Sequence, residues 1–230
     1  MKRNGKKSAF ECPHAGAWTL LLLKNSAVIL AGGFSRRFGQ DKGLIDLGGK
    51  PLILHVVDRV SEVTDETLVV VGSQAQKKKF KSLLGHKAKV FVDKQEIQSP
   101  LVGASTGFEF GQGEYSLLLS CDTPFISTQI ARFLLDICIN KGAAIPRWPS
   151  GYIEPLQAAY HTKPALTAAK KALEQGNLNL RSMIAGLREV RYISTVVLEQ
   201  TDPKLLTFLN INTPEDLEKA KSLLKTADCL

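Results

Sequence analysis

A glycine pair followed by two spaced cations is the first feature of this 230-residue chain that could do chemistry. Gly32 and Gly33 follow the apolar residues 26–30, and Arg37 and Lys42 come shortly downstream. Glycine lacks a Cβ, so backbone amides beside it can approach phosphate oxygens closely. A planar guanidinium and a mobile ammonium both suit the charge of a leaving pyrophosphate. The run therefore predicts a loop that holds a polyphosphate.

Neither of the two commonest glycine loops is present in the sequence. The patterns GxxxxGK[ST] and GxGxxG are both absent, which weighs against a Walker-type NTPase and a Rossmann dehydrogenase. A bare pair of glycines would favour an ordinary turn. The spaced Arg, Gly and Lys that follow the pair favour the phosphate loop instead.

Two aspartates also follow apolar runs, where strands of an open α/β sheet present their ligand edge. Asp122 ends the run 117–121, and Asp93 ends the shorter run 90–92. A carboxylate placed there suits Mg²⁺, which takes oxygen ligands and leaves phosphates and water to supply the others. The competing interpretation of Asp122 is an N-cap for the helix expected near Ser127. Asp93 on its own would be read as a turn residue.

A third candidate region spans residues 210–217, which are interpreted as a strand end followed by a capped helix. Thr213 is expected to cap this helix, and Pro214 takes the first helical position. The acids that follow, Glu215 and Asp216, favour the positive end of the helix dipole.

The elements that must position these residues alternate between short apolar runs and stretches of helical period. Buried strands are predicted at 26–30, 68–71, 90–92, 115–119, 143–145 and 156–160, with a strand-like segment at 188–198. Helices are predicted at 51–60, 74–84, 101–110, 127–140, 164–175 and 215–224. Strands that are apolar on both faces and alternate with helices predict an α/β fold, a three-layer, doubly wound and mostly parallel sheet.

Residues 30–42, of the form LAGGxSxRxGxDK, and the run Leu-Gly-Gly-Lys-Pro-Leu at 47–52 resemble the molybdenum cofactor guanylyltransferase family. That family lies within the nucleotidyltransferase superfamily, which activates sugars, polyols and cofactors with NTPs. The resemblance covers residues 26–224. It implies a Rossmann-like nucleotide-diphospho-sugar transferase fold and an Mg²⁺-dependent enzyme that transfers GMP from GTP to the phosphate of molybdopterin, releasing pyrophosphate.

The resemblance also implies roles for particular residues. Catalytic roles fall to Arg37, Lys42 and Asp122. Nucleotide binding falls to Leu30, Ala31, Gly32, Gly33, Lys42, Asp93 and Asp122. Asp122 and Asn212 are the expected Mg²⁺ ligands, with Asn210 a weaker candidate. The protein partners implied are a molybdopterin-loading protein and apo-molybdoenzymes.

The acceptor side departs from the family pattern at one position. Residues 151–160 resemble an acceptor-side segment that usually carries His where Gln157 stands, so hydrogen bonding remains possible there but an acid–base role is weakened. Four further residues either meet the acceptor or simply pack or lie at the surface: Arg147, Tyr152, Tyr160 and Arg181.

A second departure concerns the base. Gly72 stands where the guanylyltransferases often carry an Asn that contacts the nucleotide, so guanine and cytosine both remain open. The alternatives are a cytidylyltransferase acting on the same pterin, a sugar-phosphate nucleotidylyltransferase, and a cofactor-binding chaperone on the same scaffold.

The charge of the chain favours anionic partners, because 30 Lys and Arg oppose 22 Asp and Glu. Nucleic acid is not expected, since the lysines at 77–79 and Lys81 lack interleaved aromatic residues. No membrane span is expected either, because the apolar run at 15–23 is too short. The four cysteines include no CxxC pair, which favours reduced thiols and a cytoplasmic protein. Residues 1–25 are expected to form a basic, flexible extension and 26–226 a single nucleotidyltransferase domain.

Overall fold

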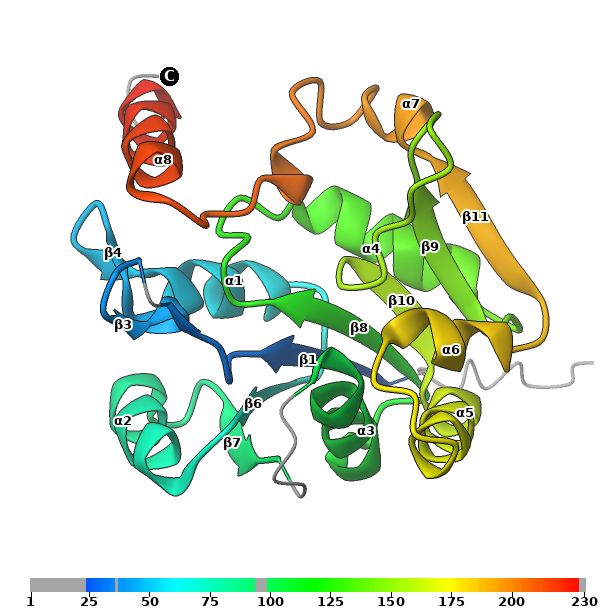
Figure 1. Ribbon diagram of the computed structural model, residues 1–230. Helices are drawn as coiled ribbons and strands as arrows, with labels where there is room; N and C mark the ends of the chain where they lie inside the picture. Colours follow the sequence, from blue (N-terminus) through cyan, green and yellow to red (C-terminus); the bar gives the residue numbers. More distant parts are fainter. Residues whose placement is uncertain (1–23, 36, 94–98, 228–230) are drawn as a thin grey trace, which may run out of the picture.

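The computed structural model describes residues 24–35, 37–93 and 99–227. A seven-stranded sheet forms its middle layer, in the order β11-β9-β10-β8-β1-β6-β7 (Figure 1). Its strands are β1 (Asn25–Leu30), β6 (Glu66–Val71), β7 (Lys89–Val92), β8 (Tyr115–Ser120), β9 (Ala143–Arg147), β10 (Ala158–His161) and β11 (Val190–Ser194). Neighbouring strands run parallel except at β10, which is antiparallel to both β8 and β9. The predicted mostly parallel sheet is confirmed.

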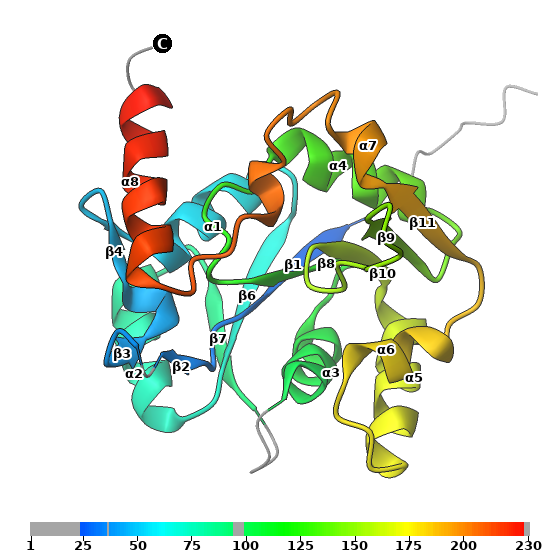
Figure 2. The same ribbon diagram turned by 45° about the horizontal axis from the view of Figure 1, so that its top comes forward.

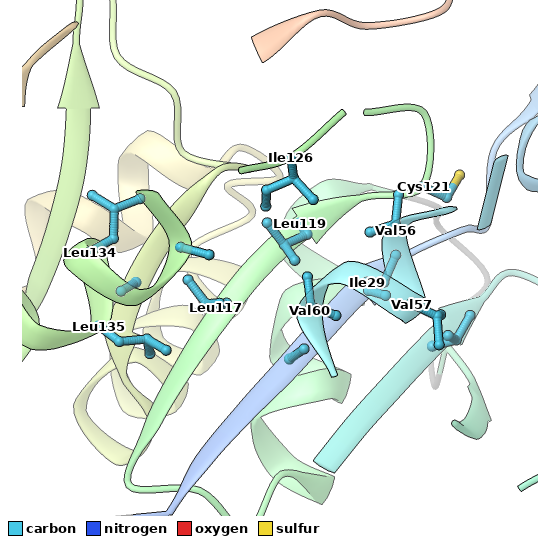
Figure 3. Packing of buried hydrophobic residues seen from close by; sticks show 14 of the residues in the cluster. Ile29, Val56, Val57, Val60, Leu117, Leu119, Cys121, Ile126, Leu134 and Leu135 are labelled. Carbon is cyan, nitrogen blue, oxygen red and sulfur yellow. The ribbon is translucent and has the colours of Figure 1, made fainter. Parts of the chain in front are cut away.

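Helices cover both faces of this sheet, because its central strands are apolar on both sides. On one face, Ile29, Leu117 and Leu119 pack against α1 (Leu52–Val60) and α4 (Thr128–Cys138) (Figure 3). The helix α2 (Gln74–Leu84) joins the same cluster. On the other face lie α3 (Pro100–Phe110), α5 (Thr162–Glu174) and α6 (Leu180–Ala185), packed on Val28, Val70 and Leu118. The three-layer, doubly wound architecture is confirmed.

A third apolar cluster holds the C-terminal helix α8 (Pro214–Ala227) against the segment that follows the phosphate loop. Ala220 of α8 packs with Ile45, Leu47, Leu52 and Ile211. Figure 2 shows α8 beside β4 (Asp46–Leu47), which pairs with β5 (Lys50–Pro51). The segment just before α8, where Asn212 lies, is thereby fixed near the phosphate loop.

Two sequence-based predictions near the C-terminus were wrong. Residues 195–198 form the short helix α7 (Thr195–Leu198), although their valines favour a strand. The hydroxyl of Ser194 caps this helix by accepting a hydrogen bond from Val196 N, at 3.3 Å, and local capping overrides the β propensity. Residues 210–211 are not a strand either, and follow the 3₁₀ turn η2 (Leu206–Phe208) as irregular backbone.

Several shorter elements were not predicted. They are α6, the hairpin of β2 (Phe34–Ser35) with β3 (Gln40–Asp41), the hairpin of β4 with β5, and the 3₁₀ turns η1 (Lys42–Leu44) and η2. Two-residue strands are too short to show a period of alternation.

Some of the predicted segments lie outside the described residues. The extension expected at 1–25 does so except for Lys24 and Asn25, and Asn25 is already the first residue of β1. Cys12 and Cys229 are also outside the described residues. In the part of the chain that the structure describes, no helix is both long enough and apolar enough to cross a bilayer.

Candidate functional site

The loop after β1 folds back on itself and brings Lys42 beside the glycine pair. Ala31 N donates to Val70 O at 2.8 Å, which fixes the start of the loop to the neighbouring strand β6. The β2–β3 hairpin then reverses the chain, and Lys42 N donates to Gly33 O at 3.2 Å. A cation and the exposed backbone of Gly33 thus lie together at the carboxyl end of β1, as the sequence predicted.

Gly32 is required by the close approach of two strand ends. A Cβ on Gly32 would lie 3.0 Å from Gly72 N, a backbone atom that follows β6. By contrast, nothing lies within 4 Å of the position a Cβ would take on Gly33. The two glycines therefore serve different purposes: Gly32 allows packing of the sheet edge, and Gly33 leaves open backbone facing the solvent.

Gln76 connects both strand ends to the β2–β3 hairpin, a role that the sequence analysis missed. Its Oε1 accepts from Gly72 N at 2.8 Å, and its Nε2 donates to the buried Asp41 Oδ1 at 2.8 Å and to Gly32 O at 3.4 Å. Lys79 Nζ lies 3.3 Å from the other Asp41 oxygen. One side chain thus ties together three backbone segments around the loop.

Asp122 follows β8 and is 6% exposed. The hydroxyl of Ser120 donates to its Oδ1, which orients the carboxylate. Asp122 does not cap the next helix, because Ser127 does so by accepting from Ile130 N at 3.3 Å. The competing interpretation of Asp122 as an N-cap is therefore wrong, and its carboxylate faces Lys42 instead.

The ammonium of Lys42 joins Asp122 to Asn212. Lys42 Nζ lies 2.9 Å from Asp122 Oδ2 and 2.6 Å from Asn212 Oδ1. Ile211 N donates to Asp122 O at 2.9 Å, and this backbone hydrogen bond holds Asn212 beside Asp122. Arg37 Nη1 reaches Asn212 O at 3.5 Å, so both predicted cations of the loop meet the same segment.

The side-chain oxygens of Asp122 and Asn212 are ligands of the kind that Mg²⁺ takes. Within residues 24–35, 37–93 and 99–227, no group of three or more His, Cys, Asp or Glu side chains is placed to hold a metal. Asp122 Oδ2 and Asn212 Oδ1 nevertheless converge on one ammonium, which marks a point where two hard oxygen ligands meet a cation. Mg²⁺ is commonly bound by one or two protein oxygens with phosphates and water completing the shell.

A cavity of about 310 Å³ opens beside this group. Of the predicted nucleotide residues, it is lined by Leu30, Gly32, Gly33, Lys42, Asp93 and Asp122. Ala31 does not line it, because its side chain packs in the core and only its backbone belongs to the loop. Arg37 and Asn212 are outside the lining and reach the site through their contacts with each other and with Lys42.

Asp93 is half-buried on the wall of this cavity, at the end of β7. Its Oδ1 has no hydrogen-bond partner among the described residues, and a Cβ on Gly103 would lie 3.6 Å from that oxygen. Burial raises the pKa of Asp93 from 3.8 to about 6, and a hydrogen bond with Thr106 opposes the rise. An unpaired carboxyl oxygen in a cavity can accept a hydrogen bond from a ligand N–H or O–H.

A second cavity of about 380 Å³ adjoins the first and shares Pro100 and Leu156 with it. Gln157, Tyr152 and Arg181 line it, which brings together three of the residues expected on the acceptor side. Asn210 lines this cavity and its amide donates to Phe208 O at 3.3 Å, so the weaker metal candidate lies away from Lys42.

Tyr160 and Arg147, the two remaining residues considered for the acceptor side, line neither of these cavities. Tyr160 is fully buried and its hydroxyl donates to Pro155 O at 2.8 Å. The guanidinium of Arg147 stacks over Tyr192, with its Cζ 5.3 Å from the ring centre. The packing interpretation of Tyr160 and the surface interpretation of Arg147, which is exposed, are therefore confirmed.

Cys121 precedes the site aspartate but is not a nucleophile. Its side chain is 3% exposed, and burial raises the pKa of the thiol, so the reactive thiolate is disfavoured. Cys138 is buried and unbridged as well.

The phosphate loop, Asp93 and Asp122 all lie within a segment that matches a known protein family. Residues 27–191 match the model of the MobA-like NTP transferase domain. A molybdenum cofactor guanylyltransferase of Desulfosudis oleivorans is 34% identical over 202 residues, covering 87% of this chain and 96% of that protein. A probable molybdenum cofactor guanylyltransferase of Natranaerobius thermophilus is 35% identical over 202 residues, covering 86% of this chain and 96% of that protein.

Solved structures agree with these sequence relatives. Molybdopterin-guanine dinucleotide biosynthesis protein A from Archaeoglobus fulgidus superposes with a TM-score of 0.75 at 28% identity, covering 88% of this chain and 99% of that one. A CMP:2-keto-3-deoxy-manno-octonic acid synthetase bound to CTP has a TM-score of 0.66 at 19% identity, covering 89% and 99% of the two chains, and shows a shared fold alone.

Proposed function

This chain belongs to the MobA-like NTP transferase family, and from that premise we propose that it transfers GMP from GTP to the phosphate of molybdopterin. It is an enzyme of the nucleotidyltransferase class. The guanylyl assignment is supported by the names of relatives about a third identical to it, and by the Archaeoglobus structure. The functional unit in this proposal is the single domain 26–226.

The observation that carries this proposal is the meeting of Lys42 with Asp122 and Asn212 beside the glycine loop. We place the triphosphate of GTP along Gly32, Gly33 and Lys42, with the nucleoside in the cavity that Leu30 and Asp93 line. The phosphate loop and the acidic strand end then contact the same substrate from two sides.

The reaction exchanges one phosphorus–oxygen bond for another. An oxygen of the acceptor phosphate attacks the α-phosphorus of GTP in line, and the bond to the β-phosphate breaks as pyrophosphate leaves. A phosphate monoester is already ionised near neutral pH, so no general base is required. The protein has to align two anions and neutralise the charge that grows on the leaving group. Lys42 and Arg37 are the proposed donors to the leaving pyrophosphate.

Asp122 and Asn212 are the proposed ligands of Mg²⁺, through the two oxygens that now meet at Lys42. Mg²⁺ held there would supply Lewis-acid stabilisation of the phosphates. The Lys42 ammonium would contact the triphosphate from the loop side. In the absence of substrate the same ammonium balances the buried carboxylate.

The proposal also covers the location of the enzyme and its protein partners. Among the described residues, Cys121 and Cys138 are buried and unbridged, which fits a reducing compartment. We propose a cytoplasmic location. A molybdopterin-loading protein upstream and apo-molybdoenzymes downstream are the proposed protein partners.

The test is pyrophosphate release by the purified chain with molybdopterin, Mg²⁺ and each of GTP, CTP, ATP and UTP in turn. Release with GTP well above release with the other three is the expected result. Release with CTP and none with GTP would make the chain a cytidylyltransferase for the same acceptor. Binding of molybdopterin without any pyrophosphate release would make it a cofactor-binding protein.

A further inference from the structure

The cavity of about 380 Å³ beside the nucleotide cavity has its own hydrogen-bonding groups. It lies where β10 begins, between the starts of α3 and α6. Figure 2 shows α3 and α6 on the same side of the sheet. Its volume is within the range of cavities that hold small organic ligands. Because Pro100 and Leu156 line both cavities, occupants of the two would lie side by side.

Gln157 supplies an unused donor at this cavity. The residue is only 3% exposed, and its Nε2 has no hydrogen-bond partner among the residues that the structure describes. Buried amide donors are almost always paired, since an unpaired one is unfavourable. A ligand that brings an oxygen to Gln157 would satisfy this donor.

Glu154 supplies an acceptor at the same cavity. Trp148 Nε1 donates to its Oε1 at 2.7 Å, which holds the carboxyl in place. A carboxylate can accept several further hydrogen bonds, so it retains capacity for donors from a ligand. Burial raises the pKa of Glu154, and a pair of ligand N–H groups would offset that desolvation.

Tyr152 and Arg181 supply flat surfaces at the edge of the cavity. Tyr152 is 53% exposed, and the guanidinium Cζ of Arg181 lies 5.8 Å from the centre of its ring. Aromatic rings and guanidinium planes both stack on flat heterocycles. The cavity therefore combines a carboxylate, an amide donor and stacking groups.

We propose that this cavity binds the pterin ring of the acceptor by its 2-amino-4-oxo edge, with Glu154 accepting from the ring N–H and amino groups and Gln157 donating to the ring oxygen. This inference rests on the proposed function, which supplies the pterin. Guanine carries the same edge. The pterin is the occupant we assign, because the phosphate loop and Asp93 place the nucleotide in the adjoining cavity.

The test uses free pterin as a fluorescent probe, titrated into the protein at saturating GTP and Mg²⁺. Pterin has no phosphate, so GTP is not consumed. The comparison ligand is lumazine, which has a carbonyl in place of the 2-amino group. Wild-type protein is expected to bind pterin at least about tenfold more tightly than lumazine, because the carbonyl would face a carboxylate.

Two variants and one control locate this preference. Glu154→Gln should abolish the preference for pterin over lumazine while retaining the acceptor for Trp148. Gln157→Met should weaken both ligands about tenfold. Gln129→Met, an exposed glutamine on α4, should behave as wild type. The ratio of the two ligands is measured within one folded protein, so lower stability of a variant does not imitate the result.

Three results would overturn the inference. They are no binding of pterin by wild type, an unchanged pterin preference in Glu154→Gln, and a loss of GTP affinity in these variants with pterin binding intact. The last of these results would mean that the cavity binds the 2-amino-4-oxo edge of guanine and not that of the pterin. Pyrophosphate release from GTP and molybdopterin, followed in parallel, separates the two proposals. Pyrophosphate release by wild type, together with an unchanged pterin preference in Glu154→Gln, rejects the inference alone. A pterin preference that Glu154→Gln abolishes, without pyrophosphate release by wild type, rejects the proposed function.

Discussion

Lys42 Nζ lies 2.9 Å from Asp122 Oδ2, although the two residues are 80 positions apart in the chain. Each follows a different strand of the sheet, β1 or β8, and these strands are parallel neighbours. Their loops therefore leave the sheet at the same edge. The pair joins the phosphate loop to the acidic strand end.

Asp122→Asn should lower the rate of pyrophosphate release at saturating substrate by at least about a hundredfold. The amide keeps the shape of the side chain but loses the negative charge that attracts a divalent cation. Steady-state kinetics against Mg²⁺ concentration is the measurement, and chelation of the metal should abolish the wild-type rate. Asp136→Asn, on the exposed face of α4, is the matched control. Equal rates for wild type and Asp122→Asn would contradict the proposed role.

The two loop glycines should respond differently to alanine. Gly32→Ala places a Cβ 3.0 Å from Gly72 N and should lower the free energy of unfolding by about 1–3 kcal/mol. Gly33→Ala meets no atom within 4 Å and should leave stability within about 0.5 kcal/mol of wild type. It should still raise the KM for GTP, because the methyl group would stand where phosphate oxygens approach. Urea denaturation and kinetics together make the comparison, and equal stability losses would refute it.

Gln76→Met should weaken GTP binding and lower stability together. Without the amide, Gly72 N and the buried Asp41 each lose a partner, which costs about 1–3 kcal/mol in unfolding free energy. The loop is then held less firmly, so the KM for GTP should rise more than kcat falls. Gln129→Met is the control for the change of side chain. If Gln76→Met were destabilised with an unchanged KM, Gln76 would be a purely structural residue.

Asp93 should make stability depend on pH in the acid range. Its pKa is raised from 3.8 to about 6, so the folded protein binds this proton more readily than the unfolded chain does. Stability contributed by the protonated carboxyl is therefore lost as pH rises from about 4 to about 6. The difference in unfolding free energy between wild type and Asp93→Asn, measured across this range, should move in favour of the variant as pH rises. A difference that does not change with pH would contradict the assignment.

The sequence predicted the sheet well because its central strands are apolar on both faces and each is followed by a helix. It predicted the ligand edge for the same reason, since Gly32, Asp93 and Asp122 each follow such a run. No pattern along the chain gives the distance between Lys42 and Asn212, which depends on the fold of the β2–β3 hairpin and on how α8 packs. That contact emerges only from the folded structure.

Gln76 shows what the sequence analysis overlooked. It precedes the lysines at 77–79, which the sequence analysis considered only as a surface for nucleic acid. Yet Gln76, Phe80 and Leu84 are spaced by four residues and form the buried side of α2. A polar residue in register with an apolar stripe was the available signal. For residues 195–198, by contrast, the valines favour a strand, and the structure shows a helix that Ser194 caps.

The fate of the phosphorus atoms of GTP shows directly whether this site transfers a nucleotidyl group. The purified chain is given molybdopterin, Mg²⁺ and GTP labelled at either the α- or the γ-phosphate. The α-label is expected in the pterin product, and the γ-label is expected in the released pyrophosphate. Transfer of the γ-label to the pterin, or its release as inorganic phosphate, would mean that the glycine loop, Lys42 and Asp122 serve a different phosphoryl reaction.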